Sequence, residues 1–159
     1  MAARRYWLMK SEPDVFSIGD LRQSKGQTSY WDGVRNYQAR NFLRDEIAVG
    51  DGVLFYHSSA EPPGIAGEAV VVRTGYPDPT AFDPKDHHYD PKSDRARPTW
   101  YVVDVKYVRA CRSLIALSRL RTVPALKSML LLKRGMRLSV QPVSANHWRA
   151  IMAMSEWDG

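Results

Sequence analysis

The sequence predicts an α+β domain built on a small curled or barrel-like sheet of five or six strands, with short helices around it. The chain has 159 residues, about the size of one domain with a complete core. Five or six segments have the alternating or continuous apolar pattern of strands. Short segments with helix-capping residues lie between them irregularly, unlike the regular alternation of a parallel α/β fold. We therefore expect residues 1–159 to form a single domain.

The N-terminal third begins with two predicted elements and an extended piece. Arg5–Lys10 is a run of aromatic and aliphatic residues closed by a proline-containing turn, as expected of a buried first strand. Ser17-Ile-Gly-Asp20 has the form of a capping box, so a short helix is expected from Ser17 to about Ser24. Thr28–Trp31 is expected to be briefly extended before the turn at Asp32-Gly33.

A second helix, a hairpin and a long loop are expected next. Asn36 is a good N-cap for a helix reaching about Glu46, because apolar residues recur there at helical spacing. Val53–His57 and Gly64–Thr74 are apolar enough to be two strands paired as a hairpin. Gly75–Pro98 is rich in proline and acidic residues and has no period, so it is predicted to be a long ordered loop.

The C-terminal part contains the strongest strand signal of the chain. Thr99–Arg109 alternates apolar and polar residues in the manner of a strand. Leu114–Leu120 and Pro124–Leu131 are predicted to be short helices, and Met136–Val143 a strand. A last helix, capped by Ser144, is expected over Ala145 to about Met154.

The charge of the chain is unevenly distributed. The net charge is +6, and residues 106–149 contain ten lysines and arginines and no acidic residue. Such a field of one sign attracts polyanions, although a solvated basic surface explains the same composition. The apolar runs are far too short for a membrane span, so no membrane partner is expected.

The cysteine content indicates the redox environment in which the protein works. Cys111 is the only cysteine, so no disulfide can form within the chain. This composition is typical of a reducing compartment, and we expect a cytoplasmic location.

Thr28–Arg44, with the sequence TSYWDGVRNYQARNFLR, combines the residue types of nucleotide recognition. It offers an aromatic surface for stacking, amides that read a hydrogen-bonding edge, and guanidinium groups for phosphate. Trp31 lies beside a polar turn and is predicted to stack on a base. Core positions are expected for the other four tryptophans, Trp7, Trp100, Trp148 and Trp157.

Metal binding and catalysis find little support in the sequence. His87 and His88 lie among aspartates, but adjacent histidines on an extended chain point in opposite directions, so neither a metal nor a cofactor is expected. The pair Cys111 and His57 lacks a local activating feature, and no glycine-rich phosphate loop is present. A binding module is therefore predicted, with an enzyme acting on a base or nucleotide, or a small-metabolite protein, as the alternatives.

Several long blocks, in collinear order, resemble the EVE domain family. They are YWLMKSEP at 6–13, WDGVRNYQARNFLR at 31–44, GDGVLFYHS at 50–58, PPGIAG at 62–67, YPDPTAFDP at 76–84, HYDPKS at 88–93 and LLKRGMRLSVQPV at 131–143. The resemblance implies a PUA-like curled β-barrel related to the YTH domain. It also implies a reader that flips a modified base, such as 5-methylcytosine, 5-hydroxymethylcytosine or N6-methyladenine, into a pocket in DNA or RNA.

The same resemblance suggests which residues form the pocket. By similarity, the base-binding residues are Lys10, Ser11, Trp31, Asp32, Asn36, Tyr56, His57, Ser58, Arg137, Ser139 and Gln141. The residues expected to bind phosphate are Arg35, Arg40, Lys133 and Arg134. The protein is expected to be a monomer, with a nuclease or an RNA-modification protein as a possible partner.

Overall fold

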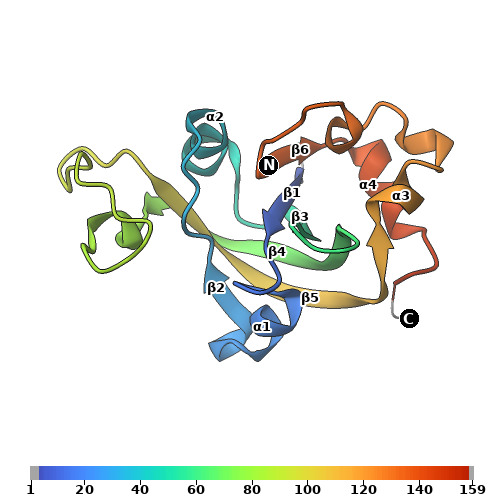
Figure 1. Cartoon of the computed structure of the whole chain (residues 1–159), viewed down its shortest axis with the longest axis horizontal. Coiled ribbons are helices and arrows are strands. Elements are labelled where there is room, and N and C mark those ends of the chain that lie inside the picture. Colours follow the sequence, from blue (N-terminus) through green and yellow to red (C-terminus); the bar gives the residue numbers. More distant parts are fainter. Residues whose placement is uncertain (1–3, 158–159) are drawn as a thin grey trace.

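A mixed sheet of six strands forms the centre of the computed structural model, which describes residues 4–157 (Figure 1). The strand order is β2-β5-β4-β3-β1-β6. The strands are β1 (Tyr6–Ser11), β2 (Thr28–Tyr30), β3 (Gly52–His57), β4 (Gly64–Pro77), β5 (Tyr101–Ala116) and β6 (Val140–Val143). Strands β1 and β3 run parallel, and the other neighbours are antiparallel. Over the described residues β2 and β6 each pair on one side only, so the predicted α+β class is confirmed with an open sheet.

Short helices cover both faces of this sheet. The α-helices are α1 (Ile18–Gln23), α2 (Tyr37–Asn41), α3 (Leu117–Leu120) and α4 (Ala145–Met152). A π-helical turn at Phe42–Glu46 continues α2, and 3-10 turns lie at Lys25–Gln27, Pro79–Phe82, Pro124–Leu126 and Leu130–Leu132. In Figure 1, α1 lies beside β2 at the bottom of the view and α2 lies at the top, whereas α3 and α4 lie together at the right, towards the C-terminal end. No helix within residues 4–157 has the length and apolar character needed to cross a membrane.

Strand alternation divides the apolar residues into two cores. On β1, Trp7 and Met9 face the first core, and Leu8 faces the second. Phe55 and Trp31 also belong to the first core, which α1 and α2 help to enclose. The second core lies under α3 and α4. All side chains named here are at most 5% exposed, so the sheet is buried on both faces around these positions.

Local capping residues begin the helices where the sequence predicts. The Ser17 hydroxyl accepts from the Asp20 amide, and the Asp20 carboxylate accepts from the Ser17 amide, which completes the capping box. The Asn36 side chain accepts from the Ala39 amide, and the Ser144 hydroxyl accepts from the His147 amide. These helix starts are therefore confirmed.

Three predicted elements in the C-terminal part are wrong in extent. Leu114–Leu120 is not one helix, because β5 continues to Ala116 through pairing with β4. Pro124–Leu131 contains only 3-10 turns, with Leu126 buried in the second core. The last strand is Val140–Val143 alone, and residues 136–139 form an irregular approach to it.

The segment between β4 and β5 forms the predicted long ordered loop, with two differences at its start. Strand β4 extends to Pro77, three residues into the predicted loop, and the 3-10 turn Pro79–Phe82 follows. The loop projects from one end of the sheet and is drawn in yellow-green in Figure 1. It brings His87 and His88 close to Asp32, although more than 50 residues of sequence separate them.

Candidate functional site

A cavity of about 390 Å³ opens between the ends of β1 and β2 and the loop before β5. This volume lies within the roughly 300–1,000 Å³ typical of small-ligand sites. Its lining residues are Lys10, Ser11, Val15, Phe16, Ser29, Tyr30, Trp31, Asp32, His87 and His88. The structure therefore brings together the predicted residues Lys10, Ser11, Trp31 and Asp32 around one hollow.

Aromatic side chains form the apolar wall of the cavity. Trp31 is 5% exposed and meets Phe55 edge to face, with the ring centroids 5.2 Å apart. The Trp31 amide donates to the Val103 carbonyl at 2.8 Å, which fixes the backbone beside β5. Phe16 and Tyr30 complete this wall, and a flat ring such as a nucleobase can stack against such a surface.

Lys10 and Ser11, at the end of β1, line the polar side of the cavity. The Ser11 hydroxyl donates to the Phe16 carbonyl at 2.6 Å, which holds the chain that follows β1 close to the strand. The Lys10 amide donates to the Ser139 carbonyl at 2.8 Å, and burial lowers the pKa of the Lys10 ammonium group. A cationic donor and a hydroxyl therefore stand beside the aromatic wall.

Asp32 and His88 lie side by side in the lining of the cavity. The His88 Nδ1 atom lies 3.4 Å from Asp32 Oδ2 and 3.3 Å from Asp86 Oδ1. Burial raises the pKa of the Asp32 carboxyl, and His88 opposes this shift only in part. A carboxyl group at this position can pair with the edge of a base.

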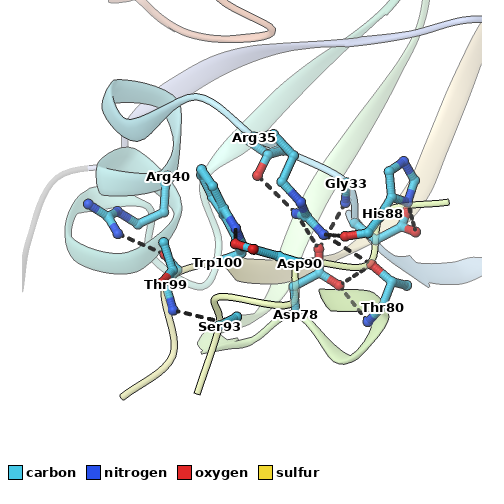
Figure 2. Close-up of polar contacts among 12 residues, drawn as sticks. Gly33, Arg35, Arg40, Asp78, Thr80, His88, Asp90, Ser93, Thr99 and Trp100 are labelled. Atoms are coloured by element: carbon cyan, nitrogen blue, oxygen red, sulfur yellow. Dashed lines mark hydrogen bonds and ion pairs between the residues drawn. The ribbon is translucent and has the colours of Figure 1, made fainter. Parts of the chain in front are cut away.

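The buried carboxylate of Asp78 holds the turn at Gly33, the residue after Asp32 (Figure 2). Its Oδ2 atom accepts from the Gly33 amide at 2.9 Å and from Arg35 Nη1 at 3.0 Å. Its Oδ1 atom accepts from the Thr80 amide and hydroxyl. Burial alone would raise the pKa of Asp78, but the hydrogen bonds from Thr80, Gly33 and Arg35 outweigh it and lower that pKa. The network thus ties the loop to the turn that carries Asp32.

Gly33 is required by the same turn. Its φ is +76°, a left-handed conformation that favours glycine. A Cβ at this position would lie 2.4 Å from His88 Nε2. The His88 ring can therefore lie over the backbone only because residue 33 has no side chain.

Arg35 and Arg40 anchor the loop from the side of α2 (Figure 2). Arg35 also donates to the His88 carbonyl at 2.7 Å, and its guanidinium lies 5.2 Å from the Trp100 ring centroid. Arg40 donates to the Thr99 carbonyl at 2.7 Å. The guanidinium groups of both arginines are thus bonded to acceptors within the protein, and their contact with phosphate stays a prediction.

The predicted residues of β3 lie around the cavity and do not line it. Tyr56 faces the second core, because alternation along β3 places it opposite Phe55. The His57 Nε2 atom accepts from the Ile18 amide, and burial lowers the pKa of this imidazole. The Ser58 amide donates to the Ser11 carbonyl at 3.0 Å. His57 and Ser58 therefore support the segments that carry Ser11 and Phe16.

The cavity lining also lacks four other predicted pocket residues: Asn36, Arg137, Ser139 and Gln141. The Asn36 side chain caps α2. The predicted strand Met136–Val143 begins only at Val140, so among Arg137, Ser139 and Gln141 only Gln141 lies in β6. Gln141 is 1% exposed and donates to the Leu138 carbonyl, whereas Arg137 is exposed. Ser139 touches the site only through its carbonyl bond to Lys10.

Lys133 and Arg134 are exposed in the turn between the last 3-10 turn and β6. They do not line the cavity. Among the four predicted phosphate ligands, these two present solvent-exposed side chains.

Six residues that line the cavity are not among the pocket residues predicted from the sequence: Val15, Phe16, Ser29, Tyr30, His87 and His88. Tyr30 could have been found, because it belongs to the same aromatic stretch as Trp31. No site is expected at His88 from the sequence alone, because the backbone there is taken to be extended. The backbone turns there instead, with the Tyr89 amide donating to the Asp86 carbonyl, and the rings of His87 and His88 lie 3.8 Å apart.

A larger hollow of about 500 Å³ lies at the start of β1, beside Arg4, Tyr6 and His147. The Tyr6 ring stacks on Trp148 at 4.4 Å, and the Arg4 guanidinium lies 5.3 Å from the Tyr6 ring centroid. Trp148 and Arg4 already cover the Tyr6 ring in this hollow. The smaller cavity at Trp31 is therefore the better candidate for a stacked ligand.

The thiol of Cys111 is not activated as a nucleophile. Burial raises its pKa to about 12, and Arg109 opposes this only in part. The thiol therefore stays protonated at neutral pH.

Comparison with known proteins places the chain in a family. A family model described as the EVE domain matches residues 5–154, almost the whole of the described structure. The chain belongs to the EVE domain family. Human thymocyte nuclear protein 1 is 42% identical over 168 residues, covering 95% of this chain and 74% of that protein. An uncharacterised protein of Schizosaccharomyces pombe is 36% identical, covering 96% of this chain and 69% of that protein.

Solved EVE-family structures resemble the present one closely. The structure of human THYN1 protein in complex with DNA containing 5-methylcytosine gives a TM-score of 0.89 at 42% identity. That match covers 98% of this chain and 99% of the other. A protein from Pseudomonas syringae gives a TM-score of 0.88 at 50% identity, covering 93% of this chain and 97% of the other.

The expected cytoplasmic location is wrong. The vertebrate relatives are named as nuclear proteins, and the human one was solved with DNA. A single reduced cysteine does not distinguish the cytoplasm from the nucleus, because both compartments keep thiols reduced.

Proposed function

We propose that this EVE domain is a non-enzymatic reader of modified bases in DNA, with 5-methylcytosine as its first candidate ligand. The observation that carries the proposal is the cavity at Trp31, where an aromatic wall faces a rim of hydrogen-bonding groups. The human relative solved with DNA containing 5-methylcytosine supports it, since the two folds superpose over almost their full lengths.

The lining residues suggest separate roles in holding a flipped base. Trp31 supplies the stacking surface, and Val15 and Phe16 offer apolar contact for a base methyl group. Ser11 and Asp32 pair with polar atoms on the edge of the base. Unstacking the base costs a few kcal/mol, which these contacts must offset.

Phosphate contacts add the remaining affinity. Lys133 and Arg134 are exposed and belong to the stretch of residues 106–149 that lacks acidic residues. Lys10 stands at the rim of the cavity itself. Arg35 and Arg40 hold the loop, so removing either should weaken binding through the shape of the pocket.

The choice of ligand is tested with a panel of short oligonucleotides. DNA duplexes with unmodified cytosine, 5-methylcytosine, 5-hydroxymethylcytosine or N6-methyladenine, and matched RNAs, are titrated while tryptophan fluorescence is followed, with a chelator present. We expect the tightest binding to 5-methylcytosine DNA and a linear fall of log K with log salt. Equal affinity for every oligonucleotide would contradict base reading, and a salt slope of zero would contradict the phosphate contacts.

A further inference from the structure

Asp86, His87 and His88 form a cluster of metal-binding side chains at the edge of the cavity. One ligand atom from each lies within 4.8 Å of the others. His87 Nδ1 lies 3.7 Å from Asp86 Oδ1, and His88 Nδ1 lies 3.3 Å from the same oxygen. Two imidazoles and a carboxylate therefore converge on one point.

The backbone turn is what brings the two imidazoles together. The Asp86 Oδ1 atom accepts from the His88 amide at 2.8 Å, and the Asp86 carbonyl accepts from the Tyr89 amide at 3.0 Å. In this turn the two adjacent rings share one side, with their planes at 42°. Adjacent histidines point in opposite directions on an extended strand, but His87 and His88 do not, because they lie in a turn.

The burial of the His88 Nδ1 atom is a further observation on the same cluster. This atom is closed to solvent and has no hydrogen-bond partner among residues 4–157. A buried polar atom without a hydrogen-bond partner destabilises the fold, so it calls for a ligand. Asp32 Oδ2 stands 3.4 Å from the same nitrogen and adds a carboxylate on the side of the cavity.

The separations match the edges of a metal coordination tetrahedron. With Zn–N and Zn–O bonds of about 2.0–2.2 Å, neighbouring ligand atoms lie about 3.3–3.6 Å apart. The distances of 3.3 and 3.4 Å from His88 fall within this range, and the 3.7 Å between His87 and Asp86 lies just above it. Imidazole and carboxylate donors suit Zn²⁺ and related ions, whereas Mg²⁺ prefers oxygen ligands.

We propose that Asp86, His87 and His88 bind a divalent transition-metal ion, with Asp32 as a fourth ligand and Zn²⁺ as the best match. The bound ion links the loop before β5 to the turn after β2. It thereby fixes one wall of the cavity. The proposal is independent of the proposed function, because metal binding is measured without nucleic acid.

The test uses the full chain without a polyhistidine tag and Zn²⁺ or Co²⁺ as the probe. His87 is the residue to change, because its side chain is 77% exposed and its loss should leave the fold intact. We expect one equivalent of Zn²⁺ to bind and His87→Ala to weaken binding about tenfold or more. Co²⁺ should give the visible absorption of a tetrahedral site in the wild type only. Zn²⁺ should also raise the melting temperature of the wild type more than that of the variant.

The matched control is His147→Ala, a histidine outside the cavity, and it should bind Zn²⁺ as the wild type does. Excess Mg²⁺ should not compete. Equal Zn²⁺ affinity in the wild type and His87→Ala, or no binding to the wild type, would overturn the proposal.

Discussion

Replacing Asp78 by asparagine is expected to lower the free energy of unfolding by about 3–5 kcal/mol. Four donors converge on the two carboxylate oxygens, from Gly33, Arg35 and both polar groups of Thr80. An amide has one acceptor oxygen and would turn an NH₂ group toward two of these donors. Arg35 would also lose the buried charge that pairs with it. Urea unfolding of both proteins measures the loss.

The control for this substitution is Asp83→Asn, in the same loop. Asp83 is exposed and accepts a hydrogen bond from the Lys85 amide, which asparagine can also accept. We expect a change within about 0.5 kcal/mol. A similar small loss for Asp78→Asn would show that the network does not hold the loop.

The stability contributed by Asp78 should also depend on pH. The pKa of this carboxyl is lower in the folded protein than in the unfolded chain. Its contribution is therefore fully present above the unfolded pKa, and it is lost as the pH falls through the folded pKa. In Asp78→Asn this part of the acid destabilisation should be missing.

Trp31→Ala is expected to destabilise the protein by about 3–5 kcal/mol, because Trp31 is 5% exposed and belongs to the first core. The substitution removes the ring that meets Phe55 and leaves a cavity between β2 and β3. For a domain of this size the melting temperature should fall by about 6–20 °C. Thermal unfolding followed by circular dichroism measures the shift.

Tyr37→Ala is the control for the loss of an aromatic ring. Tyr37 is 63% exposed and stacks on Trp100, so we expect a cost of about 0.5–1.5 kcal/mol. If Trp31→Ala cost no more than this, Trp31 would not be a core residue. The large expected cost also means that a loss of binding in Trp31→Ala cannot by itself be assigned to stacking.

The sequence predicts the features of this fold that depend on neighbouring residues. The capping box at Ser17, the caps at Asn36 and Ser144, and the apolar runs of β1 and β3 are all local patterns. Such patterns are visible in a window of a few residues. Lys10, Ser11, Trp31 and Asp32, which the family resemblance suggests as pocket residues, line one cavity, and their contact with a base stays a prediction.

The sequence does not predict features that depend on distant partners. Arg35 and Arg40 resemble phosphate ligands, but their partners Asp78 and the Thr99 carbonyl lie 43 and 59 residues away. The end of β5 contains the helix-forming residues Leu114 and Ala116, yet pairing with β4 keeps it extended. Similarly, only the turn at Asp86 shows that His87 and His88 share one side. Tertiary contacts decided each of these cases.

Removing Asp32 tests most directly whether the cavity reads the base. Asp32 lines the cavity with a side chain that is 35% exposed, so Asp32→Ala should fold, and Asp14→Ala makes the same charge change on an exposed residue outside the cavity. The measurement is the ratio of affinities for duplexes with 5-methylcytosine and with cytosine, in the presence of a chelator. We expect Asp32→Ala to lose about 1–3 kcal/mol of this preference and Asp14→Ala to keep it. An unchanged preference in Asp32→Ala would contradict a base bound in this cavity.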